Sequence, residues 1–139
     1  GRTSASLVSR RTGAESTVAR RWFKGNLHCH TANSDGDSTP DEVVAWYRDA
    51  GYDFLALTNH DLLTLPADHR GVAGPMELIH GEEVTASDIH MNALGIRRAV
   101  TPVIAPTERL TLDTNASNIR DAGENSDGHR AWLQSSFVA

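Results

Sequence analysis

The chain has 139 residues, of which 39% are hydrophobic and 22% are charged, and its formal net charge at pH 7 is −5. This composition is typical of one globular domain and excludes a mainly disordered chain. The sequence contains no run of about 18 apolar residues, which excludes a membrane-spanning helix. The single cysteine, Cys29, excludes an internal disulfide and a zinc site built from several thiolates. The acidic balance disfavours nucleic acid as a partner, and seven histidines beside 18 acidic residues favour a metal site.

The charge is unevenly distributed along the chain. Residues 1–24 contain six basic residues and one acid, whereas residues 25–139 contain seven basic and 17 acidic residues. We expect residues 1–20 to be a flexible basic tail and residues 21–139 to be the domain. The tail has no apolar segment of the kind found in secretory signals, so we expect a soluble protein and favour the cytoplasm.

The first half of the chain has the pattern of a β-α-β unit. Thr39 and Glu42 have capping-box spacing, and Gly51 suits the position just past a helix end. Such a unit predicts a parallel sheet with a right-handed crossover. The predicted elements are a strand at 22–30, a loop at 31–39, a helix at 40–50 and an apolar strand at 52–58.

The second half is less regular. Gly123 is expected to end its longest predicted helix. The predicted elements are a short helix within 62–74, a strand at 76–85, a partner strand at 91–96, a loop or short strand at 100–106, a helix at 115–122 and a segment at 131–138 that fits a strand or a helix.

Two histidines stand at alternate positions of the first predicted strand. Since side chains alternate between the faces of a strand, His28 and His30 are expected on one face and Cys29 on the other, so Cys29 is not counted as a ligand. Paired histidines before a loop suit a metal site. The same pair also fits two histidines that only satisfy polar groups at a strand end.

Further imidazoles and carboxylates follow the next strands. The carboxyl ends of parallel strands meet at one edge, so His60 and Glu83 are expected near the first pair. Asp35 lies in the loop at that edge, and His90 can lie close to Glu83. Mixed imidazole and carboxylate ligands suit Zn, Mn or Fe, and one carboxylate can bridge two ions about 3.5–4 Å apart.

Several motifs, in order, resemble those of the PHP (polymerase and histidinol phosphatase) superfamily. The Gly-Asn-Leu-His sequence at 25–28 is most similar to the branch of carbaryl-hydrolase-like proteins. The resemblance covers about residues 21–96. The matching segments are 21–31 with 34–36, 40–44, 51–61, 81–85 and 90–95.

The resemblance implies an α/β fold, a distorted (β/α)7-type barrel, with two or three divalent metal ions at the carboxyl ends of its strands. One ion would bind His28, His30 and a bridging Glu83. A second would share Glu83 and bind His90, and a third would bind Asp35 and His60. Asp61 would orient an imidazole.

The last third departs from the family pattern. No His-Pro dipeptide is present, and only 36 residues separate His90 from Asp127, so the barrel is expected to be incomplete at its C-terminal side. Asp127 and His129 resemble the closing Asp-x-His motif and would then complete the first and third ion sites. The alternative is a coincidental turn at 127–129.

The resemblance implies a metal-dependent hydrolase that acts on a small phosphoester through metal-activated water. The catalytic set would be His28, His30, His60 and Glu83. Two alternatives stay open: a carbamate, amide or ester hydrolase at the same site, and a non-catalytic metal-binding domain. Exposed strand edges could be covered by self-association.

Other polar and aromatic residues are interpreted without a role in the site. We expect His69 on the surface, His80 in a structural role and Glu82 as a solvated neighbour of Glu83. The tryptophans are expected in the core or at its rim.

Overall fold

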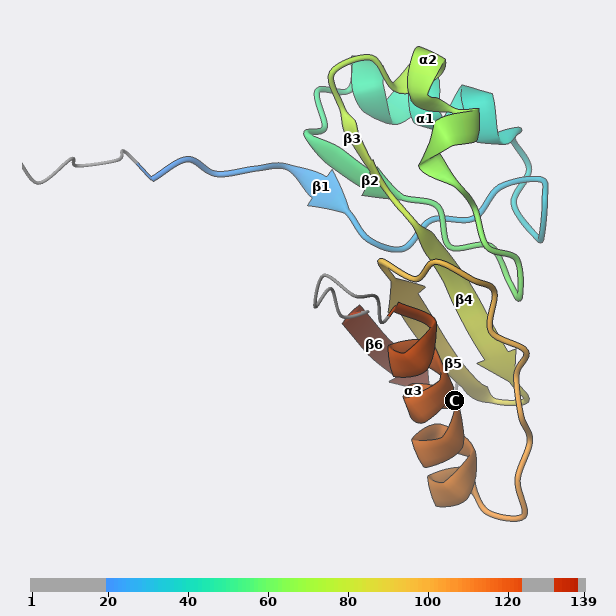
Figure 1. Ribbon diagram of the computed structural model, residues 1–139. Coiled ribbons are helices and arrows are strands. Elements are labelled where there is room, and N and C mark those ends of the chain that lie inside the picture. Colours follow the sequence, from blue (N-terminus) through green and yellow to red (C-terminus); the bar gives the residue numbers. More distant parts are fainter. Residues whose placement is uncertain (1–19, 124–131, 138–139) are drawn as a thin grey trace, which may run out of the picture.

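A computed structural model describes residues 20–123 and 132–137 of the chain, and its strands form two three-stranded sheets (Figure 1). The first sheet is parallel and the second is antiparallel. We call residues 20–79 the first lobe and residues 81–123 with 132–137 the second lobe. The first sheet contains β1 (Gly25–Asn26), β2 (Phe54–Ala56) and β3 (Glu77–Ile79), and the second contains β4 (Gly81–Ala86), β5 (Ile89–Leu94) and β6 (Trp132–Phe137).

The first lobe is built around α1 (Pro40–Asp49), whose start has the predicted capping box. The Thr39 hydroxyl accepts from the amide of Glu42, and the Glu42 carboxylate accepts from the amide of Thr39 at 2.9 Å. Gly51 has φ +74° just past the helix end, a conformation that favours glycine. The lobe also contains η1 (Pro66–Asp68) and α2 (Arg70–Ala73). Its buried core consists of Val44, Leu55, Leu57, Ala73 and Met76.

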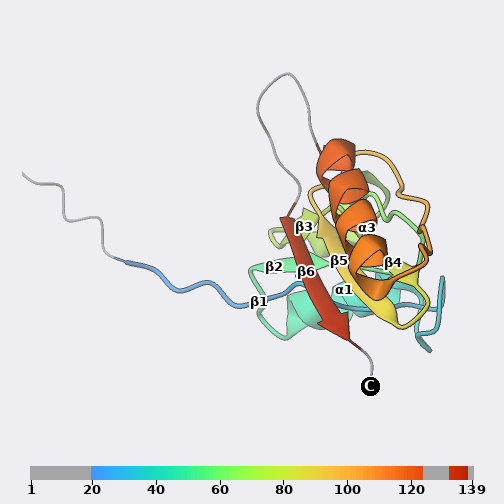
Figure 2. The ribbon, with the colours of Figure 1, turned by 90° about the horizontal axis from the view of Figure 1, so that it is seen from below.

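The second lobe has its own core, formed where α3 (Glu108–Gly123) packs along the antiparallel sheet beside β5 (Figure 2). Burial of apolar side chains from both elements stabilises this core. No helix within residues 20–123 is long and apolar enough to cross a membrane. The buried members of the core are Val84, Ile89, Met91, Ala93, Ile96, Val100, Ile119 and Ala122.

Alternation along β4 gives the second sheet two different faces. Val84 belongs to the core under α3, while Glu83 and Thr85 occupy the opposite face. In the register of the hairpin, Glu83 lies across from Asn92 and Thr85 lies across from His90. The polar face of the second sheet therefore combines residues of both strands.

Backbone hydrogen bonds join this polar face to the first lobe. The amide of Glu83 donates to the carbonyl of Asn59 at 3.0 Å, and the amide of Asp61 donates to the carbonyl of Glu83 at 2.9 Å. Isolated β-bridges also pair His60 with Glu83 and Thr64 with Gly81. The loop after β2 is thus held directly against the start of β4.

The structure confirms the α/β class, the parallel β-α-β unit and the β4–β5 pairing, and it corrects several boundaries. The predicted strand 76–85 is two strands, since its halves pair with different partners: β3 with β2, and β4 with β5. In the predicted strand 22–30, only Gly25–Asn26 pairs with a neighbour. The helix predicted at 115–122 starts at Glu108. Of the alternatives predicted elsewhere, the loop is the one found at 100–106 and the strand is the one found within 131–138, as β6.

The described residues form two open sheets without barrel closure, so the (β/α)7 barrel stays a prediction. Trp22 and Trp46 are 95% and 62% exposed, so the core position predicted as one alternative is wrong for these two, while the side chain of Trp132 lies outside the described part of the chain.

Candidate metal centre

Six of the eight predicted ligands lie together where the two lobes meet. They come from four places: the loop after β1, the loop after β2, strand β4 and strand β5. Asp127 and His129 lie outside the described residues. The six are His28, His30, Asp35, His60, Glu83 and His90, and they form three overlapping groups of three.

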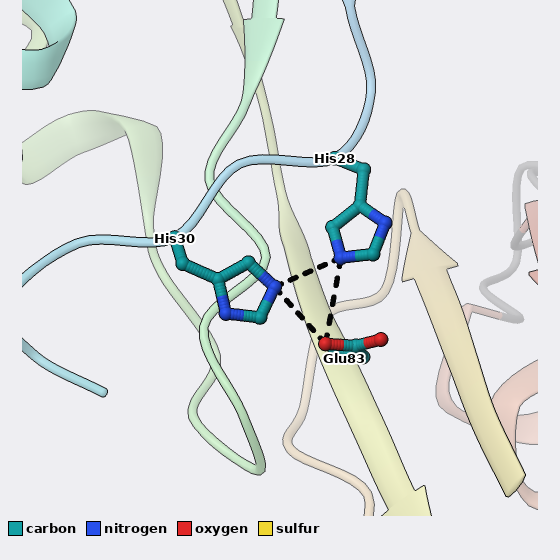
Figure 3. A group of neighbouring side chains, drawn as sticks. All are labelled: His28, His30 and Glu83. Carbon is teal, nitrogen blue, oxygen red and sulfur yellow. Dashed lines mark hydrogen bonds and ion pairs between the residues drawn. The ribbon is translucent and has the colours of Figure 1, made fainter. Parts of the chain in front are cut away.

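The first group joins His28, His30 and Glu83 (Figure 3). The two histidine Nε2 atoms are 2.8 Å apart, and Glu83 Oε2 lies 3.4 Å from His28 Nε2 and 3.0 Å from His30 Nε2. Four ligands at about 2.0–2.1 Å around a tetrahedral zinc ion lie about 3.3 Å from one another. The three atoms therefore have the mutual spacing of ligands to one ion, although His28 and His30 lie on irregular chain beyond β1 rather than on the predicted strand.

The second group joins His30, Asp35 and His60. His30 Nδ1 lies 2.6 Å from Asp35 Oδ1, and His60 Nε2 lies 3.4 Å from Asp35 Oδ2. The hydrogen bond with His30 holds the pKa of the Asp35 carboxyl below its usual value, with further help from the nearby histidine charges. Asp35 is therefore a carboxylate that can either bind a cation or orient the His30 ring.

The third group joins His60, Glu83 and His90. Glu83 Oε2 lies 3.3 Å from His60 Nδ1, while its Oε1 lies 3.2 Å from His90 Nδ1. The Glu83 side chain is only 3% exposed, so both oxygens are turned inward among imidazoles. The two oxygens of one carboxylate thus face different histidines, which is the arrangement that bridging two cations requires.

The donor atoms near these groups fit a divalent cation of the zinc, manganese or iron type. Imidazole nitrogens and carboxylate oxygens are the ligands offered, with no thiolate among the groups that the described residues form. Cys29 instead borders a groove of about 400 Å³ with Trp46 and Tyr47. Burial raises the pKa of the Cys29 thiol, which keeps it protonated.

Glu82 corrects the sequence analysis. It was expected in solvent, but alternation along β4 turns it to the face under α3, where it is 0% exposed. Its Oε1 accepts from the amide of Val100 at 2.7 Å, and its Oε2 has no partner among the described residues. Burial raises the pKa of Glu82 to about 7. The Glu82 side chain therefore holds the segment after β5 against β4, and it does not belong to the candidate metal centre.

Two contacts that position the His60 ring differ from the sequence analysis, which expected Asp61 to orient an imidazole and did not include Thr85. Asp61 Oδ1 accepts from the backbone amide of Thr85 at 2.8 Å, and the Thr85 hydroxyl lies 2.6 Å from His60 Nδ1. Asp61 therefore acts on the imidazole through Thr85. The alternation that places Thr85 on the same face as Glu83 was the available signal.

The remaining histidines lie outside the three groups. His80 Nδ1 contacts the carbonyl of Ile96 at 3.2 Å, in keeping with the structural role expected for it. His69 was expected on the surface, but its side chain is only 16% exposed and its Nδ1 lies 2.7 Å from Asp41 Oδ1. His69 thus ties the start of α2 to the start of α1.

The chain is similar in sequence to a curated protein and in structure to several solved proteins. No family model matches the chain. The phosphoribosyl 1,2-cyclic phosphate 1,2-diphosphodiesterase of Eggerthella lenta is 30% identical over an alignment of 101 positions, which covers 67% of this chain and 38% of the relative. The chain thus spans well under half the length of this curated relative.

Both solved structures have a TM-score of 0.47 and cover 68% of this chain and 32% of their own. One, from Bifidobacterium adolescentis, is described as a metal-dependent phosphoesterase and is 26% identical. The other is an amidohydrolase from Chromobacterium violaceum, 29% identical, solved with bound sulfate and no metal. The name of the curated relative is that of a phosphodiesterase, which agrees with the class of enzyme predicted from the sequence. The carbaryl-hydrolase-like branch stays a prediction.

Proposed function

We propose that this chain carries the metal centre of a metal-dependent phosphoesterase. The observation that carries the proposal is the sharing of Glu83 between two groups of histidines at the meeting point of the lobes. Isolated acidic clusters on protein surfaces lack this feature. Here a carboxylate that is 3% exposed has four imidazoles around it, and bound cations would offset the cost of burying its charge.

The proposed ligands are those of the three groups. His28, His30 and Glu83 would hold one ion, Glu83 and His90 a second, and Asp35 and His60 a third. Asp127 and His129 are proposed as additional ligands, from the sequence motif alone. We also propose that residues 21–139 belong to a PHP-type domain.

Divalent cations in such a centre polarise phosphoester oxygens and lower the pKa of water to about 7, which makes a nucleophile available at neutral pH. The chain's own contribution is to hold the ligands. Thr85 fixes one nitrogen of His60, and the hydrogen bond to Asp35 fixes one nitrogen of His30. Each ring then presents its other nitrogen in a defined direction.

The exposure of the ligands indicates the side from which a substrate would approach. The His28 and Asp35 side chains are 40% and 63% exposed, whereas Glu83 is closed off beneath them. A phosphate group would therefore meet the centre from the loops of the first lobe. The name of the Eggerthella lenta relative specifies a cyclic phosphodiester, so we propose a small phosphodiester as the first class of substrate to test.

The test combines a metal count with turnover by the full chain loaded with Mn²⁺ or Zn²⁺. We expect hydrolysis of bis(4-nitrophenyl) phosphate, with 4-nitrophenyl phosphate, an aryl ester and an aryl carbamate assayed in parallel. Glu83→Gln should lower the rate at least about 1,000-fold, since removing several kcal/mol of stabilisation costs about tenfold per 1.4 kcal/mol. Glu77→Gln on β3 is the matched control, because Glu77 is exposed and belongs to none of the three groups.

Other results would redirect the proposal. Full activity of the Glu83→Gln variant would contradict it. Turnover of the ester or carbamate alone would favour the alternative hydrolase. Bound metal without turnover of any of the four substrates would favour a non-catalytic metal-binding domain.

A further inference from the structure

Asn59, the residue before His60, is fully buried between the loop after β1 and the start of β4. We propose that Asn59 is the positioning residue of the metal centre: its side chain fixes the loop that carries His30 and Asp35 against the strand that carries Glu83. This inference rests on the proposed function, because it concerns the affinity of that centre for metal.

The acceptor end of the Asn59 side chain holds the loop. Its Oδ1 lies 2.8 Å from the backbone amide of Thr31, 3.0 Å from the Thr31 hydroxyl and 3.0 Å from the Ser34 hydroxyl. Thr31 directly follows His30, and Ser34 directly precedes Asp35. One oxygen therefore restrains the chain next to two of the proposed ligands.

The other polar atoms of Asn59 link it to the second lobe, the side-chain amide through Thr64 and the backbone carbonyl directly. Its Nδ2 donates to the Thr64 hydroxyl at 3.2 Å, and the amide of Thr64 donates to the carbonyl of Gly81 at 3.1 Å. Its backbone carbonyl accepts from the amide of Glu83 at 3.0 Å. Asn59 thus contacts the chain beside His30, Asp35 and Glu83, and His60 is its neighbour in sequence.

The loop needs such a restraint because no strand supports it. Residues 31–36 form turns, with bonds such as those from the amides of Ser34 and Gly36 to the carbonyl of Thr31. These bonds shape the loop but do not fix its place relative to β4. A buried amide whose acceptor and donor are both satisfied stabilises one arrangement strongly, because leaving either atom buried without a partner is unfavourable.

A purely structural role would be shared by any buried asparagine, and the chain provides one for comparison. Asn115 on α3 is also 0% exposed. Its Oδ1 accepts from the amide of Val103 at 2.8 Å, and its Nδ2 donates to the carbonyls of Val103 and Thr111. Asn115 belongs to the second lobe and has no hydrogen bond with the loop after β1 among the described residues.

The experiment compares Asn59→Leu, Asn59→Asp and Asn115→Leu in the full chain. Zn²⁺ affinity is measured by competition with a chromophoric chelator, the site geometry by the visible absorption of bound Co²⁺, and the metal-free stability by thermal unfolding. We expect Asn59→Leu to weaken Zn²⁺ binding about 10–100-fold and to change the Co²⁺ spectrum, as loss of groups that orient metal ligands does. Asn59→Asp keeps the acceptor for all three loop donors, and the Thr64 hydroxyl can donate to its second oxygen, so it should restore the affinity to within about threefold. Asn115→Leu should lower the stability and leave Zn²⁺ affinity unchanged.

The outcomes separate the two proposals. No Zn²⁺ binding by the wild-type chain would overturn the proposed function and this inference together. Wild-type affinity in Asn59→Leu, or an equal loss of affinity in Asn115→Leu, would overturn the inference alone. Should Asn59→Leu fail to fold, Thr64→Val removes the acceptor of the Asn59 Nδ2 group without touching a proposed ligand. A several-fold weaker Zn²⁺ affinity supports the inference, and an unchanged affinity contradicts it.

Discussion

The two lobes present proposed ligands in different ways. The first lobe supplies His28, His30, Asp35 and His60 from loops, whereas the second supplies Glu83 and His90 from adjacent strands. In the second lobe the register of the hairpin, with Thr85 across from His90, sets the positions of the side chains. In the first lobe the loop after β2 is bonded to β4 through its backbone, whereas the loop after β1 is positioned by side chains such as Asn59. Strand pairing and buried side-chain hydrogen bonds are thus two solutions to the same positioning problem.

The largest expected effect separates a shared loop ligand from an unshared strand ligand. His30 belongs to two of the three groups and His90 to one. We expect His30→Ala to lower kcat/KM for bis(4-nitrophenyl) phosphate by about 1,000-fold and His90→Ala by about 100-fold, at about 1.4 kcal/mol per tenfold. Steady-state kinetics at saturating Mn²⁺ measures both values. An equal or larger loss in His90→Ala would mean that the strand lobe dominates the chemistry.

The second prediction asks whether the lobes unfold as one unit. Leu55 and Met91 are each 0% exposed, one in each core. Leu55→Ala and Met91→Ala should each lower the free energy of unfolding by about 2–5 kcal/mol, because each leaves a cavity in a packed core. The bonds between Asn59, Asp61 and Glu83 lead us to expect one transition in urea, followed by circular dichroism and tryptophan fluorescence. Two separate transitions would show that the lobes are independent.

The smallest predicted effect concerns Glu82, which lies in the core of the second lobe only. A pKa raised to about 7 means that the folded chain binds a proton more tightly than the unfolded chain, so stability is lost as pH rises toward and through 7. Between pH 5.5 and pH 8 this loss should be about 2 kcal/mol, at about 1.4 kcal/mol per pKa unit.

Glu82→Gln should abolish that part of the pH dependence, because glutamine does not ionise and still offers an acceptor to the amide of Val100. Urea unfolding in the presence of EDTA measures the difference between variant and wild type at each pH, free of any contribution from bound metal. An identical pH dependence in both chains would contradict the assignment of the titration to Glu82.

Much of the site could be anticipated from local pattern. The histidines and acids were recognised from their spacing and from the family motifs, and the structure brings six of them together. Glu82 was misplaced, whereas Glu83, which the motif singled out, is the residue of this buried pair that lies among the histidines. The pattern around Glu82 cannot reveal that α3 and Val100 cover that face, since those residues are distant in sequence. Asn59 was missed because its role arises from partners 25–28 positions away.

The sequence by itself determined the capped helix α1, the apolar strand β2 and the residue types of the candidate centre, because these depend on near neighbours and on side-chain periodicity. Only the tertiary structure decided that the stretch 76–85 divides between two sheets, with Glu83 turned toward the histidines and Glu82 toward the opposite face of β4. The physical reason is that a strand's pairing partners and the cover on each of its faces come from distant segments. Local sequence indicates which residues are suited to burial, whereas long-range hydrogen bonds determine which distant segments pack against them.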